Sequence, residues 1–296
     1  MILFLKSLSW ICGHLPLSVV LAAGRGIGRL SALFGRRRKE VLERIQSCLG
    51  VDQAEAKKIR KGMYLNLGMT AVEVLRLPYM TEDEVRARIR YEGAEKAPAR
   101  GTSTIGLVAH TGNWELLAAT TSFFIDNEMN VVVKAQKPAA LNDWMIKTRS
   151  RWGTKIHDRR GSIREILRVL RNGEILAFIL DQNAKRNWGV FVDFFGRTAC
   201  TSDGLSEIAA RTGVDTYPVF CRRLPDHNLL VTVRDPIPPP QSRAPEEVRA
   251  HTQACTKAIE DFVRAHPDQW IWMHRRWRTQ PEAADTKESV EKNEDA

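Results

Sequence analysis

The chain has 296 residues, of which 43% are hydrophobic, so it is long enough to form one large globular domain or two small ones. Its formal net charge is +10, which favours anionic partners such as nucleic acid, anionic lipid or an acidic carrier protein. The five cysteines are scattered and odd in number, and no cysteine or histidine group has zinc spacing, which argues against a disulfide framework and a structural zinc site.

The first 23 residues are mostly apolar, and a basic cluster follows at residues 36–39. A helix of about 20 apolar residues is long enough to cross a bilayer, and Pro16 would kink it without forbidding it. A basic cluster after such a segment marks the cytoplasmic side and binds anionic headgroups. We therefore predict a retained, membrane-associated helix in preference to a buried core helix or a cleaved signal peptide.

Apolar residues at helical spacing predict helices over 41–49 and 53–77, and strands and helices alternate after residue 98. The predicted strands are 104–109, 130–133, 154–157, 174–180, 216–220 and 229–233, and the predicted helices are 114–124, 141–152, 162–171, 202–211 and 245–265. This alternation predicts an α/β architecture with a mixed, largely parallel sheet flanked by helices.

Three regions follow from these patterns. Residues 1–40 form the membrane-anchoring helix and basic cluster, and residues 41–280 form the main domain, which is helical over 41–97 and α/β over 98–280. Residues 281–296 are charged and poor in apolar side chains, so we expect them to be disordered.

A histidine and an acid flank the turn after the first predicted strand of the α/β region. His110 ends this strand, and the carboxyl end of a strand in an α/β sheet is where ligands bind. Glu115 would lie in the first turn of the next helix, close enough to fold back and stabilise an imidazolium. Gly112 permits a tight turn between them. On spacing alone, a structural hydrogen bond for His110 and a helix-dipole contact for Glu115 explain the pattern at least as well.

The stretch HTGNWELL at residues 110–117 resembles the H-x4-D/E motif of the lipid A biosynthesis late acyltransferases, the lauroyl and myristoyl transferases. The likeness extends over about residues 5–281. Its further blocks are 158–161 with 171–174, 181–183 with 190–196, Thr201 to Pro218, and 267–277. The resemblance implies a fold like that of the glycerolipid acyltransferases, with a helical, membrane-associated N-terminal segment.

The resemblance also implies a reaction. His110 would be the general base that removes the proton from an acceptor hydroxyl, and Glu115 would orient it. The hydroxyl oxygen would attack the thioester of an acyl carrier protein, so neither a nucleophilic side chain nor a cofactor or metal ion is expected. The acceptor would be a lipid A precursor.

Substrate-binding residues are expected beside this pair. Arg160, with Arg159 as the alternative, would stabilise the oxyanion or bind a substrate phosphate. Asp181 would bind a substrate hydroxyl or steady an arginine, and Asn113 lies within the motif itself. Solvated charges before a helix explain the arginines, and a turn-forming residue explains Asp181, without any function.

The expected partners are the acyl carrier protein, the lipid acceptor and the cytoplasmic face of the bacterial inner membrane, and not nucleic acid. A lysophospholipid, ornithine lipid or glycolipid acceptor is the alternative. Trp270, Trp272 and Trp277 alternate with basic residues, a pattern that suits a membrane interface, stacking on single-stranded nucleic acid, or a core helix. The competing classes are therefore a nucleic-acid-binding protein and a membrane scaffold without catalysis.

Overall fold

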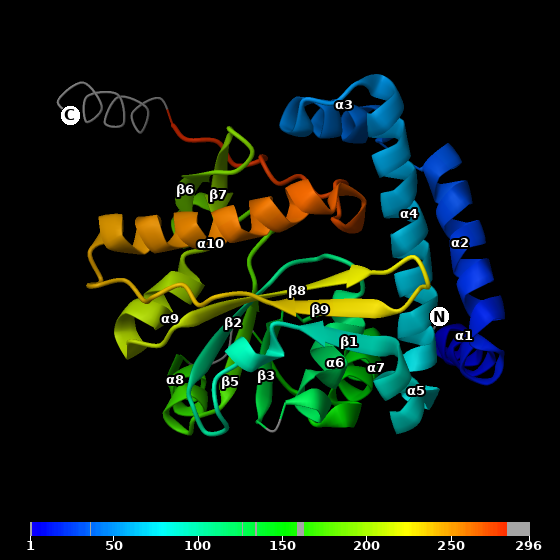
Figure 1. Cartoon of the computed structure of the whole chain (residues 1–296), viewed down its shortest axis with the longest axis horizontal. Coiled ribbons are helices and arrows are strands. Elements are labelled where there is room, and N and C mark those ends of the chain that lie inside the picture. The colour runs from blue at the N-terminus through cyan, green and yellow to red at the C-terminus, as the bar shows by residue number, and fades with distance from the viewer. Residues whose placement is uncertain (1, 36, 126, 134, 159–162, 283–296) are drawn as a thin grey trace.

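A seven-stranded sheet forms the centre of the computed structural model, which describes residues 2–35, 37–125, 127–133, 135–158 and 163–282 (Figure 1). Its strand order is β1-β9-β8-β2-β5-β3-β4. The strands are β1 (Ile89–Glu92), β2 (Thr104–Val108), β3 (Met129–Val133), β4 (Lys155–Asp158), β5 (Ile175–Ile179), β8 (Thr216–Arg223) and β9 (Leu229–Val233). The pairs from β8 to β4 are all parallel, and the antiparallel β8–β9 pair makes the sheet mixed, as predicted.

Helices cover both faces of the sheet. They are α1 (Ile2–His14), α2 (Leu17–Phe34), α3 (Arg38–Leu49), α4 (Gln53–Arg76), α5 (Glu82–Arg88), α6 (Trp114–Phe124), α7 (Ala139–Arg149), α8 (Ile163–Arg171), α9 (Gly204–Thr212) and α10 (Pro245–Ala265). Ile105 and Leu107 pack in the core shared with α8 and α10, whereas Val108 packs in the core beneath α5 and α6. This alternation along β2 is the two-residue period of a strand buried on both faces.

Local sequence fixes the ends of several elements. The side chain of Asp52 caps α4 by accepting a hydrogen bond from Glu55 N, and Thr81 caps α5 in the same way through Glu84 N. The predicted boundaries of α6, β9 and α10 are confirmed. The prediction omitted α5, β1 and the hairpin of β6 (Val190–Asp193) and β7 (Thr198–Thr201), because elements of four to seven residues give little periodic signal.

The N-terminal segment differs from the single kinked helix that was predicted over residues 2–23. Pro16 separates two helices, and the second continues to Phe34. A proline removes a backbone donor and clashes with the preceding turn, so the chain restarts rather than bends. By length and composition, α2 is the one helix among the described residues that qualifies to cross a membrane.

A buried charge network joins α4 to the sheet. Glu73 is fully enclosed, and its carboxylate accepts hydrogen bonds from Arg88 (2.6 Å), Arg223 (2.5 and 2.9 Å) and Asn113 (2.7 Å). Burial alone would raise the pKa of Glu73, but the two guanidinium groups outweigh it and lower the pKa. The network connects α4, α5, the end of β8 and the start of α6, which carries the motif residues.

Replacing Glu73 with alanine is expected to destabilise the fold by about 3–5 kcal/mol, because two buried guanidinium groups lose their only carboxylate among the described residues. Urea unfolding followed by circular dichroism measures this loss. Glu82→Ala removes an exposed partner of Arg86 and serves as the control, with an expected change below about 1 kcal/mol. Equal midpoints for the two variants would contradict a structural role for Glu73.

Candidate active site

His110 lies just beyond the carboxyl end of β2, next to the carboxyl end of β5. Gly112 makes the turn that follows, with φ of +54°, and a Cβ there would lie 2.5 Å from the carbonyl oxygen of Cys221. Only glycine fits this backbone at such close approach. The hydroxyl of Thr70 donates to Gly112 O, and Gly112 N donates to Gln269 O, so the loop is held from two sides.

Asp181 is the hydrogen-bonding partner of His110. It follows β5 and is almost completely buried. Its Oδ1 lies 2.7 Å from Nδ1 of the imidazole, and its Oδ2 accepts from the backbone N–H of His110 at 3.0 Å. The indole N–H of Trp270 donates to the same Oδ2 at 2.7 Å. Three donors therefore fix the carboxylate, and the carboxylate fixes the ring.

This arrangement selects one tautomer of His110. An ionised carboxylate only accepts hydrogen bonds, so Nδ1 carries the proton and Nε2 keeps its lone pair. The amide nitrogen of Gln182 lies 3.2 Å from Nε2, which is consistent with a donor facing that lone pair. Any other hydrogen-bond donor to Nε2 would have to approach from the side of Gln182.

The pKa values of the pair move in opposite directions. Burial alone would lower the pKa of His110, but the carboxylate of Asp181 outweighs it, aided by the more distant Glu115 and opposed by Arg149, and the pKa is raised. Burial would likewise raise the pKa of Asp181, yet His110 and the Trp270 hydrogen bond lower it to about 2. Asp181 thus stays ionised and stabilises the imidazolium that forms when His110 accepts a proton.

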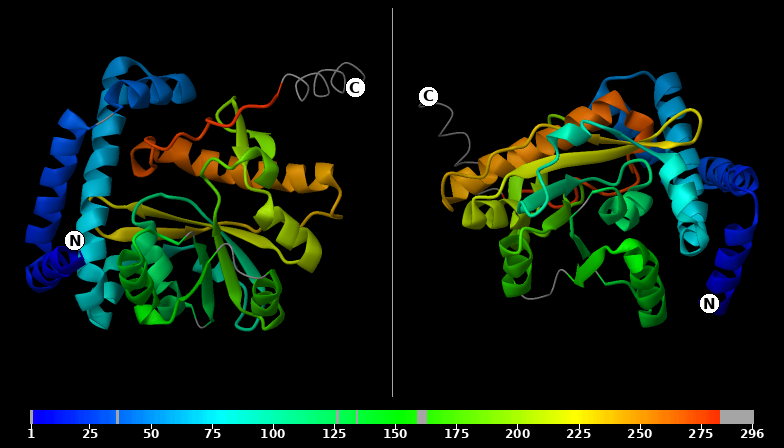
Figure 2. Two further views of the ribbon diagram at one scale, coloured as in Figure 1. Left: turned by 180° about the vertical axis from the view of Figure 1, so that it is seen from behind. Right: turned by 60° about the horizontal axis from the view of Figure 1, so that its bottom comes forward.

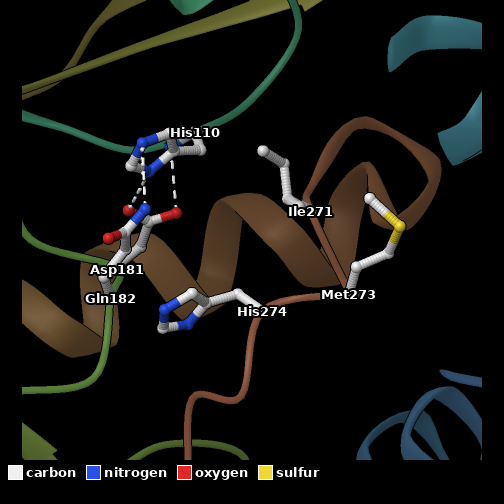
Figure 3. Close-up of a pocket in the computed structure, with 6 residues that line it drawn as sticks. All are labelled: His110, Asp181, Gln182, Ile271, Met273 and His274. Atoms are coloured by element: carbon white, nitrogen blue, oxygen red, sulfur yellow. Dashed lines mark hydrogen bonds and ion pairs between the residues drawn. The ribbon is translucent and has the colours of Figure 1, made fainter. Parts of the chain in front are cut away.

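A cavity of about 230 Å³ opens at this pair (Figure 3). Its lining residues are His110, Asp181, Gln182, Ile271, Met273 and His274. The last three come from the segment after the 3-10 turn Pro267–Gln269, which runs beside the His110 loop through a bridge between Thr111 and Trp270. Residues distant in sequence thus form one site at the carboxyl ends of the central strands.

The predicted contact between Glu115 and His110 is not made. Glu115 lies in the first turn of α6, but its carboxylate accepts two hydrogen bonds of 2.7 Å from Arg149 on α7, and a third from the indole of Trp114. A bidentate guanidinium partner holds the carboxylate more firmly than a single imidazole nitrogen does. Glu115 therefore acts on His110 through charge and not as its orienting partner.

Two predicted substrate-binding residues have other roles. Asn113 is fully buried, caps α6 by accepting from Leu116 N, and donates to Glu73, so it does not reach the cavity. Asp181 hydrogen-bonds to His110 and Trp270 and lines the cavity, and among the described residues no arginine hydrogen-bonds to it. Arg159 and Arg160 lie outside the described residues.

The tryptophans near the C-terminus form core and not a surface. Trp270, Trp272 and Trp277 are buried: Trp270 packs on Trp272, and both Trp270 and Trp277 pack on Phe194. The stretch is irregular rather than helical. The predicted core position of these tryptophans is therefore confirmed, although not on a helix. The alternatives of a membrane interface or nucleic-acid stacking are wrong, because aromatic rings inside a core cannot stack on a ligand.

Sequence reasoning missed Gln182, Trp270 and His274 as site residues. Gln182 directly follows Asp181 in a block that the prediction did quote, and His274 lies in the C-terminal block, but neither position carries a periodic or spacing signal. The described residues include no group of three or more His, Cys, Asp or Glu side chains placed to hold a metal ion.

Comparison with known proteins places this site in a family context. A family model described as bacterial lipid A biosynthesis acyltransferase matches residues 2–279. The lipid A biosynthesis lauroyltransferase of Escherichia coli (strain K12) is 24% identical over 290 residues, which cover 94% of this chain and 91% of that protein. The lipid A biosynthesis palmitoleoyltransferase of the same strain is 25% identical over 286 residues, covering 92% and 89%. A phosphatidylinositol mannoside acyltransferase of Mycobacterium tuberculosis (strain CDC 1551 / Oshkosh) is 26% identical over 214 residues, covering 69% and 66%.

Proposed function

The chain belongs to the bacterial lipid A biosynthesis acyltransferase family, and on that premise we propose that it transfers a fatty acyl group from acyl carrier protein to a hydroxyl of a lipid A precursor. The single observation that carries the mechanism is the His110–Asp181 pair at the wall of the cavity. A buried, ionised carboxylate behind a histidine whose unprotonated Nε2 lines the cavity is the arrangement that general-base catalysis needs, with the acceptor hydroxyl taking the place of the Gln182 amide at Nε2.

His110 acts on the acceptor. Its Nε2 takes the proton of the acceptor hydroxyl as the hydroxyl oxygen attacks the thioester carbonyl carbon. The tetrahedral intermediate then expels the carrier thiolate, and the imidazolium returns the proton to that sulfur. The acyl group moves directly from sulfur to oxygen through this intermediate, so no acyl-enzyme forms.

The oxyanion of the intermediate needs a hydrogen-bond donor, and we propose His274 for this role. Its imidazole lies at the wall of the same cavity, and its buried Nδ1 has no hydrogen-bond partner among the described residues (Figure 3). Burial lowers the pKa of His274, aided by Arg276 and His110 and opposed by Asp181, so the ring is neutral near pH 7. A neutral imidazole carries one N–H donor and does not repel the imidazolium of His110.

His274→Met is expected to lower kcat by about 10²–10³-fold, the usual effect of removing one oxyanion donor, with KM for both substrates little changed. His274→Gln keeps an N–H donor at the same reach and should recover part of the loss. Steady-state kinetics on both variants separates the roles. A change confined to KM, or equal rates for the two variants, would show that His274 only lines the cavity.

We further propose that the enzyme works at the cytoplasmic face of the inner membrane. The apolar N-terminal helices and the basic cluster after them support this placement. The net charge of +10 suits an acidic carrier protein as well as a phosphorylated lipid.

The function is tested with purified full-length enzyme, acyl carrier protein loaded with a labelled acyl chain, and a panel of acceptors: a lipid A precursor, a lysophospholipid and an ornithine lipid. Acyl-coenzyme A replaces the carrier protein in a parallel set. We expect transfer to the lipid A precursor from the carrier protein alone. Transfer from acyl-coenzyme A at an equal rate would reject the proposed donor, and turnover of another acceptor only would reject the proposed lipid.

A glycolipid acceptor is the second candidate. The similarity to a phosphatidylinositol mannoside acyltransferase favours it, because the similarity extends over 69% of this chain. Adding phosphatidylinositol mannoside to the acceptor panel decides between the two.

A further inference from the structure

The outer surface of α1 and α2 is rich in exposed hydrophobic side chains. We define the N-terminal apolar face by Leu3, Phe4 and Trp10 on α1 and Leu30, Leu33 and Phe34 on α2, each more than half exposed. So many exposed apolar side chains on two helices of a folded protein mark an interaction site. The opposite side of both helices is already occupied by the rest of the protein.

The side of α2 that faces the protein packs directly against α4 through glycines on both helices. Gly24 and Gly28 on α2 face Gly68 on α4, and a Cβ at Gly68 would overlap the carbonyl oxygen of Gly24. A Cβ at Gly28 would lie 2.5 Å from the carbonyl oxygen of Tyr64. The two backbones are therefore in direct contact, and Figures 1 and 2 show α2 alongside α4 in every view.

Hydrogen bonds hold α1 and the connection to α2 in place. The hydroxyl of Ser9 donates to Leu75 O at 2.6 Å, and the guanidinium of Arg76 donates to Cys12 O and Leu15 O, each at 2.7 Å. The two Arg76 contacts satisfy carbonyl groups that are left open where α1 ends. The two helices thus form a rigid unit with α4.

This packing decides how α2 can meet a membrane. If α2 crossed the bilayer while packed on α4, α4 would have to enter the hydrocarbon beside it. α4 in turn packs against α3, α6 and the 3-10 turn Pro267–Gln269, so the body of the protein would have to enter the membrane with it. Charged surface is costly in the hydrocarbon region, at about 2.5–3.5 kcal/mol for each charge at its centre. A helix that is long enough to span is therefore prevented from spanning by its neighbour.

We propose that α1 and α2 lie in the plane of one leaflet, with the N-terminal apolar face in the acyl-chain region and anionic headgroups at Lys6, Arg25 and Arg29. Charge identifies the partner, because residues 2–35 contain no aspartate or glutamate. Apolar surface flanked by cations is the pattern of interfacial helices that bind anionic lipid. The proposal does not depend on the acyl-transfer reaction.

Topology is tested by cysteine labelling of the full chain in bacterial membranes. Cys12→Ser provides the background, since the other four cysteines are buried. His14→Cys and Lys39→Cys then place one thiol before and one after α2. For in-plane helices, an impermeant maleimide labels both sites in inverted inner-membrane vesicles and neither site in spheroplasts. Labelling of one site only in spheroplasts would mean that α2 spans, and would overturn the proposal.

The lipid partner is tested by flotation with sealed vesicles of phosphatidylcholine and phosphatidylglycerol. The double variant L30E/F34E is expected to lower the bound fraction at least about tenfold. Ile163→Glu changes an exposed apolar residue on α8 and is the matched control, with unchanged binding expected. Equal flotation of the double variant and the wild type would reject the apolar face. Self-association without vesicle binding would show that a second copy, and not lipid, covers it.

Discussion

Replacing His110 with alanine is expected to lower kcat by about 10⁴-fold, the upper range for loss of a positioned general base. No other described side chain at the cavity can take its place: Asp181 is ionised but saturated with donors, and His274 has a lowered pKa. The rate of acyl transfer from labelled carrier protein measures the effect.

His266→Ala is the matched control for this substitution, because it removes a half-buried imidazole that packs on Phe262 and does not line the cavity. Its rate should stay close to that of the wild type. Melting temperatures of both variants exclude unfolding as the cause of any loss. A folded His110→Ala enzyme with more than about a tenth of normal activity would mean that another group is the base.

The sequence alone predicted the sheet and most of its helices because buried strands and amphipathic helices carry a strong periodic signal. The β5 strand, ILAFI, is apolar throughout, as a strand covered on both faces must be. The edge strand β1, by contrast, contains Arg90 and Glu92 and lies in the region 41–97 that was predicted to be helical, so that part of the prediction is wrong. The position of β1 is set by pairing with β9, which no local pattern reveals.

The site was predicted only in part, because the sequence shows which residues are close along the chain and not which strands are neighbours in the sheet. His110 and Glu115 are five residues apart, so their proximity was apparent along the chain. Asp181 lies 71 positions from His110, and only the strand order β2-β5 makes them neighbours. Without knowledge of that order, Glu115 was the acid nearest to the histidine in sequence and was predicted to contact it. No local pattern indicated that Arg149 would bind the Glu115 carboxylate instead.

The roles of Trp270 and Arg276 also depended on tertiary structure. The alternation of tryptophan and basic residues was compatible with an exposed surface or with a core helix, and the structure shows that both Trp270 and Arg276 are buried. The guanidinium of Arg276 donates to Cys200 O and to the hydroxyl of Thr201, and it stacks over Phe194. The segment from Trp270 to Trp277 thus passes through the core, and its course brings His274 to the cavity.

Asp181→Asn should lower kcat by about 10³–10⁴-fold, although the side chain keeps its size. Oδ2 of Asp181 accepts from both His110 N and the indole of Trp270, so the single oxygen of asparagine will take that position. The amide nitrogen then faces Nδ1 of His110 and donates to it. The imidazole proton must move to Nε2, and the nitrogen that should accept the substrate proton becomes a donor.

The same substitution has a signature in the pH profile that separates it from simple misfolding. In the wild type, His110 must be neutral to act as a base, and its pKa is raised, so kcat/KM should fall as pH drops through a value above 6.5. In Asp181→Asn, burial and Arg149 both lower the pKa of His110 while only Glu115 raises it, so the acid limb of the residual activity should move to lower pH. Asp83→Asn, at an exposed site on α5, is the control for both the rate and the profile. A variant with an unshifted acid limb would show that the limb reports another group, and that Asp181 holds His110 without setting its charge.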